Sequence, residues 1–368
     1  MRVVMTLCSL VLGLVMVEGL ASLARDHAFP FLNIYETDPT FGVRLKAHAS
    51  TATRSRHGRV TEVRTNSLGF RGEDWAPALS AAPQKGRVML LGDSQIFGYG
   101  VDQSDALAER LLAHLPEGSE VLNAALPTWG PQEQVFALET YGPIYRPEVV
   151  VYVANVANDW FEAKRPNVER TRAQDGWAAF VLKGQPQRLE FPFRAWLFGQ
   201  SHLVFSIRAL TSHVSGPPPQ KAVSAARLLS DLPHLLRPEG RYRSRLSAPL
   251  MAVKARCRAL GCRVIALGLP MDVQVHPSEW KKYASERVDL SATEALLDRF
   301  LGEARHHGVL ALDLRAPLLA ASPGAFLPDD YHLSPKGHEA IAHVLAEALN
   351  LTHQSAGPQQ LAHKETRP

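Results

Sequence analysis

Residues 88–101 have the sequence VMLLGDSQIFGYGV, in which an aliphatic run ends abruptly in Gly-Asp-Ser. The run at 88–91 is short, aliphatic and bounded by turn residues, a pattern that predicts a strand buried on both faces. Open α/β sheets bind their ligands at the carboxyl edge of such strands. The hydroxyl of Ser94, just past the run, is therefore expected at that edge, in the position of a nucleophile.

Strand and helix patterns alternate from residue 87 onward. Strands are predicted at 87–91, 120–123, 148–153, 262–268 and 309–313, and helices near 104–114, 131–141, 247–260, 291–307 and 335–349. Ser334 and Pro335 are typical of the N-cap and the first position of that last helix. Helical crossovers of this length imply a parallel sheet covered on both faces, so we expect a three-layer α/β/α sandwich around five mostly parallel strands.

The rest of the chain departs from this rhythm. Residues 26–86 are expected to be irregular with hairpin character, because RVTEVRTNSLGFRGED alternates and then enters a turn. Residues 160–245 contain no convincing strand of the central sheet and are predicted to form a partly helical insertion overhanging the site. The α/β domain is assigned to 87–350, and the polar tail at 351–368 is predicted to be disordered.

The amino terminus predicts a membrane segment. Residues 3–17 carry no charge, and Glu18 is the only charged side chain between Arg2 and Arg25. This apolar stretch has about the 20 residues that a membrane helix needs, so we favour an uncleaved signal anchor at 1–25 with the rest of the chain outside the cytoplasm. A cleaved signal peptide is the alternative, because the small residues around Ala24 suit a peptidase and cleavage would secrete the domain.

Composition and cysteine spacing exclude several classes of protein. The chain has 46% hydrophobic residues and a formal net charge of +4, with no long basic run, so we expect a globular protein that does not bind nucleic acid. Cys257 and Cys262 could form a local disulfide in an oxidising compartment; alternatively, Cys262 simply packs in the following strand. No second cysteine pair is available for zinc, and neither a metal nor a cofactor is expected.

One histidine pattern near the end of the domain does not predict a metal site. HEAIAH at 338–343 is reminiscent of a zinc-binding H-E-x-x-H helix, but its histidines are five residues apart and diverge around the helix. A solvated helix face is the better interpretation.

A base for Ser94 is found near the end of the domain. In LPDDYHLSPKGH, Asp329 precedes His332 by three residues, and on a tight turn its carboxylate could orient the imidazole toward Ser94. Asp330 competes for this role, but its side chain is expected to project elsewhere. A lone D-x-x-H is more often an ordinary surface turn, so the hypothesis depends on convergence with the other segments.

Acyl transfer also requires hydrogen-bond donors for the developing oxyanion. The backbone N–H of Ser94, at a helix start, is one candidate. The side-chain amide of Asn158 in VANVANDW is a second, and a backbone N–H from LNAALPTWGP is a third. All of these segments follow predicted strands and should meet at one edge of the sheet.

Together these segments resemble the motifs of the SGNH (GDSL-type) hydrolase superfamily. Four blocks occur in the order of that family across 87–349: GDSQ at 92–95, NAALPTWG at 123–130, AND at 157–159 and DDYH at 329–332. The resemblance implies a flavodoxin-like fold, a Ser94–His332–Asp329 triad, and Thr128 and Asn158 as oxyanion donors beside Ser94. The upstream TNSLGFRGED resembles the lead-in of exported, membrane-anchored bacterial members associated with surface or exopolysaccharide chemistry.

Two positions depart from the superfamily pattern. Thr128 stands where the family usually has a glycine, and its N–H could still donate if the residue avoids a positive φ, which strains a β-branched side chain. Val156 replaces the usual glycine of the third block. The nucleophile, the base, the orienting carboxylate and the amide are all present, so catalysis is expected.

The expected activity is hydrolysis of acyl esters, chiefly acetyl esters, on an exported polysaccharide through an acyl-enzyme. An O-acyltransferase using the same acyl-enzyme and a non-catalytic glycan-binding or assembly protein are the alternatives. Trp129, Trp160 and Tyr331 lie beside the catalytic blocks and could stack on a sugar ring; ordinary core or loop aromatics are the alternative for each.

Overall fold

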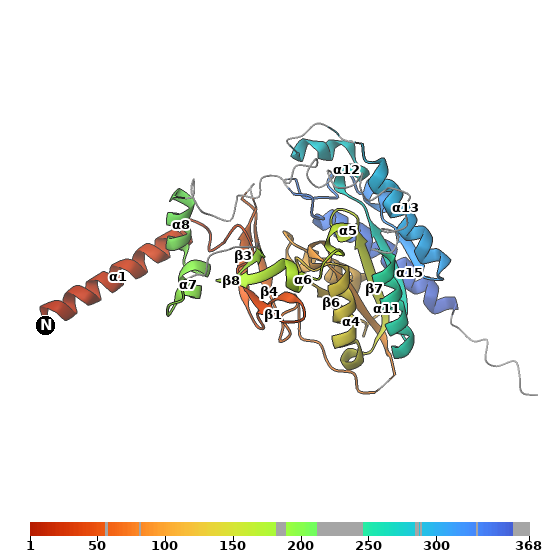
Figure 1. Cartoon of the computed structure of the whole chain (residues 1–368), viewed down its shortest axis with the longest axis horizontal. Helices are drawn as coiled ribbons and strands as arrows, with labels where there is room; N and C mark the ends of the chain where they lie inside the picture. Colours follow the sequence, from red (N-terminus) through yellow and green to blue (C-terminus); the bar gives the residue numbers. More distant parts are fainter. Residues whose placement is uncertain are drawn as a thin grey trace, which may run out of the picture.

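Figure 1 presents the computed structural model of the chain. The structure describes residues 1–55, 58–80, 82–181, 189–211, 246–283, 287, 289–328 and 330–355. A large α/β body occupies most of the molecule, and one long helix, α1 (Arg2–Leu23), projects away from it.

The body is built on a five-stranded sheet. Its strands lie in the order β11-β10-β7-β5-β6, and each neighbouring pair is parallel. Their bounds are β5 Gln84–Gly92, β6 Glu120–Ala125, β7 Pro147–Asn155, β10 Arg263–Leu269 and β11 Leu310–Asp313. The predicted strands are thus confirmed, and the central ones are buried on both faces, as their uninterrupted aliphatic runs indicated.

Helices cover both faces of this sheet and confirm the three-layer sandwich. The helices α4, α11 and α13 pack on one face, and α3 and α15 pack together on the other. The helical elements of the body are α2 Ser94–Phe97, η1 Gln103–Asp105, α3 Leu107–His114, α4 Pro131–Tyr145, α11 Ser247–Leu260, α12 Asp272–Val275, η2 Pro277–Lys282, α13 Ser291–His306, α14 Arg315–Ala320 and α15 Pro335–Ser355.

The two ends of α15 illustrate what the sequence could and could not predict. The Ser334 hydroxyl accepts hydrogen bonds from the backbone N–H groups of Lys336 and Gly337, as expected of an N-cap. The helix continues to Ser355, past the predicted start of the tail at 351, because helical geometry propagates beyond the last apolar residues. The predicted disorder of residues 356–368 concerns a segment outside the described residues.

The lead-in consists of two antiparallel hairpins. They are formed by β1 (Tyr35–Asp38) with β2 (Gly42–Leu45) and by β3 (Ser50–Arg54) with β4 (Val60–Arg64). The predicted turn follows β4, where the Asn66 side chain accepts hydrogen bonds from the N–H groups of Leu68 and Phe70. Gly69 closes this turn at φ +80° beside the Leu45 carbonyl, where a Cβ would clash.

Arg71, directly after that turn, fastens the lead-in to the body. Its guanidinium is buried and donates to the carbonyls of Gly98 and Val101, which follow α2, and to the carbonyl of Glu62. Burial lowers the pKa of Arg71 to about 10, so the group stays charged at neutral pH. These carbonyl oxygens accept hydrogen bonds from the guanidinium and so offset the cost of burying its charge.

The insertion between β7 and α11 carries a small hairpin of its own. Its described elements are α5 Asp159–Glu162, α6 Asn167–Arg170, β8 Thr171–Gln174, β9 Trp177–Phe180, α7 Arg194–Gly199 and α8 His202–Thr211. The strands β8 and β9 pair only with each other in the described sheets, so the insertion contributes no strand to the central sheet. Residues 182–188 and 212–245 lie outside the described residues.

Cys257 and Cys262 form a disulfide that joins the end of α11 to the start of β10, with their Cα atoms 4.7 Å apart. Gly261 supplies the left-handed cap between them at φ +80°. The helix α1 has no buried residue, and its hydropathy of 2.2 and its length suit a membrane span, although a signal sequence has the same properties.

Replacing the buried arginine should weaken the joint between the lead-in and the body. Arg71→Met is expected to lower the free energy of unfolding by about 3 kcal/mol or more, because at least three buried carbonyls lose their donor. Arg64→Met is the matched control, since Arg64 is exposed and its side chain pairs with the exposed Glu62 in the described part of the chain, and should cost less than about 0.5 kcal/mol. Calorimetry of the full chain in detergent measures both; equal losses would contradict the proposed role of Arg71.

Candidate active site

The nucleophile candidate lies at the carboxyl end of β5. Asp93 ends the strand and N-caps α2, accepting the Gln95 N–H at 2.9 Å, and this places Ser94 at the first position of the helix. The preceding Gly92 packs so closely that an added Cβ would lie 2.5 Å from Ile96. The chain therefore turns sharply and leaves the Ser94 side chain half-buried at the edge of the sheet.

The structure brings Ser94 and His332 together across 238 positions of sequence. His332 Nε2 lies 2.8 Å from Ser94 Oγ, and its Nδ1 lies 2.9 Å from Asp330 Oδ1. The imidazole is buried, whereas the Ser94 and Asp330 side chains remain partly exposed to solvent. A serine, a histidine and a carboxylate in this order can generate a nucleophile by general base catalysis.

The orienting carboxylate differs from the expected one. Asp330 was expected to project elsewhere, but its side chain contacts the imidazole, so that expectation is wrong. Across this turn the Leu327 N–H donates to the His332 carbonyl at 2.8 Å, and the Asp330 side chain, two positions before the histidine, faces its ring. Asp329, the residue chosen from the sequence, lies outside the described residues.

The two groups shift each other's protonation equilibria. Burial alone would lower the pKa of His332, but the nearby Asp330 carboxylate outweighs it and raises that pKa above 6.5. Burial would likewise raise the pKa of Asp330, yet the imidazole and its hydrogen bond hold that pKa below 3.8. Asp330 is therefore ionised at neutral pH, as its orienting role requires.

Gln95, which the sequence analysis did not single out, holds the histidine turn in place. Its side-chain carbonyl accepts the Leu333 N–H at 2.9 Å, and its amide donates to the Tyr331 carbonyl at 3.2 Å. The residue after the nucleophile thus binds the backbone on both sides of His332. The only signal in the sequence was an amide at the fourth position of the GDSQ block.

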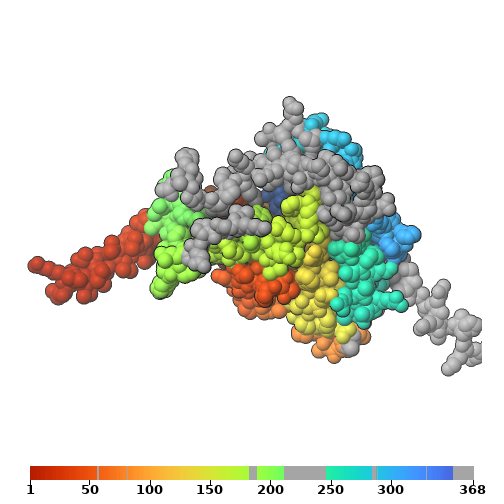
Figure 2. All heavy atoms as spheres, viewed as in Figure 1, coloured from red at the N-terminus to blue at the C-terminus, as the bar shows by residue number. Residues whose placement is uncertain are grey.

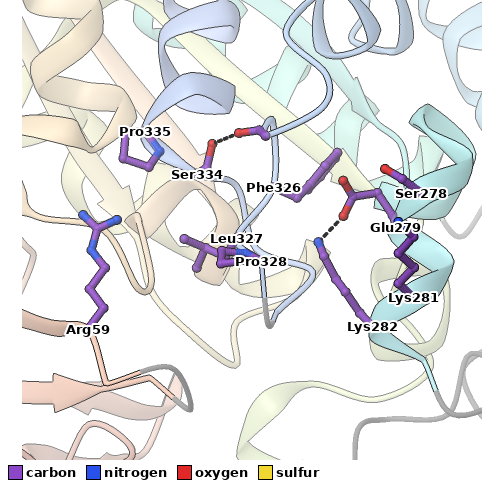
Figure 3. Close-up of a pocket in the computed structure, with 11 residues that line it drawn as sticks. Arg59, Ser278, Glu279, Lys281, Lys282, Phe326, Leu327, Pro328, Ser334 and Pro335 are labelled. Carbon is purple, nitrogen blue, oxygen red and sulfur yellow. Dashed lines mark hydrogen bonds and ion pairs between the residues drawn. The ribbon is translucent and has the colours of Figure 1, made fainter.

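Lys282 supports the same turn from η2. Its buried ammonium donates to the Asp330 carbonyl at 2.9 Å and pairs with Asp272 at 3.3 Å and with Glu279. A cavity of about 420 Å³ lies beside it, and Figure 3 shows Lys282 and Glu279 facing each other on its wall. Residues 326–328 also line it, with the centre of the Phe326 ring 5.6 Å from Lys282 Nζ, whereas Ser94 and His332 are not among the lining residues.

Asn158, expected to contribute an oxyanion donor, lies beside the nucleophile. Its amide donates to Asp93 Oδ2 at 3.3 Å, and Asn155 donates to the same oxygen at 2.9 Å. Because Asp93 directly precedes Ser94, this shared acceptor fixes the amide of Asn158 near the serine. The Asn158 side chain also hydrogen-bonds Glu162, which lowers the pKa of that carboxyl against the larger effect of burial.

Thr128 adopts the conformation that was expected to strain it. Its φ is +77°, so the condition that it avoid a positive φ is not met. Such a backbone costs roughly 1–3 kcal/mol and persists only where neighbours hold it. The neighbours are Asn167, which donates to the Thr128 hydroxyl at 3.2 Å, and Arg170, which donates to its carbonyl at 3.2 Å. Thr128 therefore retains the backbone shape of the glycine that it replaces.

The three aromatic candidates have different surroundings. Trp129 is a core residue: it is buried, stacks on Phe41 at 4.5 Å and donates to the Val43 carbonyl, so the interpretation as a sugar platform is wrong for this residue. Trp160 is also buried, and among the described residues its indole N–H finds no hydrogen-bond partner. Tyr331 stacks on the His332 ring at 4.6 Å and so lies at the site.

Tyr99 is a further aromatic neighbour of the base that sequence reasoning missed. Its ring centroid lies 4.9 Å from that of His332, and its N–H donates to the Ser94 carbonyl at 3.1 Å. The segment that carries it is the one clamped by Arg71, which bonds the carbonyls of Gly98 and Val101. The lead-in is therefore linked to the imidazole through one residue, because Arg71 binds the segment that carries Tyr99 and Tyr99 contacts the ring.

Buried carboxyl groups gather behind Asn158. Burial, with the nearby Asp93 charge, raises the pKa of Asp159 well above its usual value. Burial also raises the pKa of Glu162 to about 8, despite its ion pair with Arg170 at 3.2 Å. Both carboxyl groups are thus largely protonated at neutral pH, and they add little negative charge to the place where an oxyanion would form.

The described residues contain no group of three or more His, Cys, Asp or Glu side chains placed to hold a metal ion. The predicted solvated helix face at 338–343 is wrong for His338, which is fully buried, whereas His343 is exposed. The inward face of α15, which packs on α3, explains the difference.

A parallel α/β sandwich with a serine, a histidine and a carboxylate at its carboxyl edge has the fold of the SGNH-type hydrolases. Residues 237–368 match the family model described as "SGNH hydrolase-like domain, acetyltransferase AlgX", which confirms the resemblance to this superfamily. The matched part contains His332 and Asp330 but not Ser94 or Asn158. Among curated proteins none matches the chain.

Solved structures that resemble the chain include a putative lipolytic protein of the G-D-S-L family from Desulfitobacterium hafniense, at 12% identity and a TM-score of 0.38 over 72% of this chain and 99% of that one. A lipase/acylhydrolase from Enterococcus faecalis is similar at 14% identity and a TM-score of 0.38, over 72% and 96% of the two chains. Likenesses of this strength carry no information about activity.

Two adjacent aspartates allow a direct test of the orienting role. Asp330→Asn is expected to lower kcat about 10³-fold or more, because an amide can donate to Nδ1 and so favour the wrong imidazole tautomer. Asp329→Asn should stay within a few-fold of the wild type. Both variants are assayed on a chromogenic acetyl ester; a larger loss at position 329 would assign the role to the residue chosen from the sequence.

Proposed function

We propose that the chain is a serine esterase that forms an acyl-enzyme on Ser94 and hydrolyses acetyl esters. The observation that carries this proposal is the continuous line from Asp330 through His332 to Ser94, with contacts of 2.9 and 2.8 Å. The SGNH-type fold and the family match support the same class of acyl chemistry.

In the first step, His332 Nε2 accepts the Ser94 proton as Oγ attacks the ester carbonyl. The N–H group of Ser94 and the amide of Asn158 donate to the resulting oxyanion, a contribution worth about 10²- to 10³-fold in rate for each donor. The imidazolium then gives its proton to the departing alcohol, and the acyl group stays on Ser94. Asp330 accepts the hydrogen bond from the Nδ1–H group of His332 throughout and stays ionised.

In the second step, water loses a proton to His332 and attacks the acyl carbon. The bond between that carbon and Oγ then breaks, His332 returns the proton to Oγ, and the acid leaves. An O-acetyltransferase is the second candidate, and the description of the matching family as an acetyltransferase favours it. In that reaction a sugar hydroxyl replaces water and carries the acyl group away. The same residues perform both reactions, which differ in what occupies the site at the second step.

The proposed setting is the outer face of a membrane. The apolar helix α1 would anchor the chain, and the α/β domain would lie outside the cytoplasm, where an O-acetylated polysaccharide is the proposed substrate. The disulfide between Cys257 and Cys262 fits an oxidising compartment. Tyr331, stacked on the catalytic imidazole, is the aromatic side chain best placed to contact a sugar.

A covalent probe tests the nucleophile. A fluorophosphonate should label the wild type and Ser104→Ala, because Ser104 is exposed in η1 and takes no part in the proposed chemistry. Ser94→Ala should lose labelling entirely. Well-folded wild type that does not react would contradict catalysis and favour a glycan-binding protein. Adding an oligosaccharide acceptor to the acetyl ester assay then separates transfer from hydrolysis by mass spectrometry of the acceptor.

The protonation state of the base predicts the pH dependence. Only neutral imidazole can accept the Ser94 proton, and the pKa of His332 is raised, so kcat/KM should increase with pH through an inflection above 6.5. Asp330→Asn removes the carboxylate that raises this pKa and should move the inflection to lower pH. The profile is measured on the acetyl ester for both proteins; an unmoved inflection would show that another group titrates.

A further inference from the structure

Glu18 is an acidic residue within the apolar helix α1, where an isolated charge would be costly in a membrane. In the structure it is not isolated. Its carboxylate accepts hydrogen bonds from the Ser201 hydroxyl at 2.6 Å and from the N–H groups of His202 at 2.6 Å and Leu203 at 3.1 Å. Glu18 thus caps the N-terminus of α8, a helix 184 positions away in sequence.

A second contact fastens α8 to the end of α1. Arg25 donates to the Ser206 hydroxyl at 2.9 Å, and its guanidinium lies 4.7 Å from the centre of the Phe205 ring. Figure 1 shows α7 and α8 lying across the end of α1, between that helix and the α/β body, and Figure 2 shows α1 projecting beyond them. The insertion therefore meets the N-terminal helix where the helix joins the domain.

Both faces of α8 are apolar, and among the described residues only one of them is covered by protein. On the inner face, His202 stacks on Phe29 at 4.1 Å and Phe205 packs edge-on against the same ring at 5.6 Å. On the other side, Leu210 is 84% exposed. The neighbouring α7 segment exposes Phe193 at 83% and Trp196 at 53%. We call Phe193, Trp196 and Leu210 the α7–α8 surface.

The length of α1 places this surface relative to a bilayer. At 1.5 Å per residue, Glu18 lies about 24 Å along the helix from Arg2. The hydrocarbon core is about 30 Å thick, so Glu18 would lie about 6 Å inside its outer boundary. Amphipathic helices at membrane surfaces are buried about 5–10 Å into that boundary, and aromatic side chains are enriched there.

We propose that α1 is retained in the mature protein and that the α7–α8 surface rests in the lipid interface of the bilayer that α1 spans. The partner of this surface is the lipid interface, because α1 brings the α7–α8 surface to the depth of that interface. Cleavage after Ala24 would remove Glu18 and leave the N-terminus of α8 without its cap. This inference does not depend on Ser94 chemistry.

The rest of the insertion makes this attachment stiff. Asn33 of the lead-in donates to the Gly199 carbonyl at 2.6 Å, and Trp177 of β9 donates to the Phe198 carbonyl at 3.0 Å. Gly199 packs so tightly against the Asp175 carbonyl that no Cβ would fit. Seating α7 and α8 in the interface would therefore hold the α/β body at a fixed orientation above the membrane.

The test uses the full chain with Cys8→Ser, reconstituted in nanodiscs of zwitterionic and anionic phospholipid. Single cysteines at Phe193 and Leu210 are labelled with a fluorophore and quenched by doxyl groups attached to the lipid chains near the headgroup. Leu79→Cys is the matched control, because Leu79 is 98% exposed and lies in the lead-in. We expect quenching at 193 and 210 to be at least about five-fold stronger than at 79.

Equal, weak quenching at the three positions would overturn the proposal. Protection of 193 and 210 from aqueous iodide without lipid quenching would also overturn it, because another macromolecule would then cover the surface. A second measurement tests retention directly: mass spectrometry of the protein purified from membranes should find residues 1–24, and a chain beginning at Arg25 would refute it. Both readouts are independent of esterase activity, so their failure is distinguishable from failure of the proposed function.

Discussion

The hydrogen bond between Ser94 and His332 depends on how the turn that carries the imidazole is held. Gln95 binds the backbone of that turn at two points, the Leu333 N–H and the Tyr331 carbonyl. Two hydrogen bonds to one planar amide fix both the distance of the turn from α2 and its rotation relative to α2. Packing alone would fix this geometry less sharply. Because Gln95 directly follows the nucleophile, any shift of α2 moves the serine and the histidine together. The reacting pair is thus one unit, although its members are 238 positions apart.

The lead-in is structurally part of this unit. Arg71 enters the body and binds the carbonyls of the segment after α2, from which Tyr99 contacts the imidazole. Burying a guanidinium is costly unless its donors find partners, and here they meet the carbonyls of Glu62, Gly98 and Val101. The stabilisation is reciprocal: the carbonyls offset the desolvation of the guanidinium, and the guanidinium supplies hydrogen bonds to the carbonyls. Residues that look like a linker in the sequence therefore help to hold the base.

The sequence predicted the elements of the fold well, because uninterrupted aliphatic runs separated by helical patterns leave few alternatives to a parallel sheet. Ser94 and His332 followed from the same logic, since the carboxyl ends of parallel strands meet at one edge. What failed depended on local backbone geometry or on distant partners. The choice between neighbouring aspartates is decided by the shape of one turn, and Trp129 is a core residue because Phe41 lies against it. The partner of Glu18 lies in the insertion, where no periodicity points to it.

The charges around the site define a pH window for the chemistry. An oxyanion held by Asn158 forms beside Asp93 and close to two more carboxyl groups, and three negative charges there would oppose it. Burial keeps Asp159 protonated, and the pKa of Glu162 at about 8 keeps that group largely neutral at pH 7. Above that pKa, Glu162 gains a charge that only Arg170 offsets. The base requires a pH above the raised pKa of His332, and the oxyanion favours a pH below that of Glu162. In the proposed acyl transfer, these two groups would favour the interval between their pKa values.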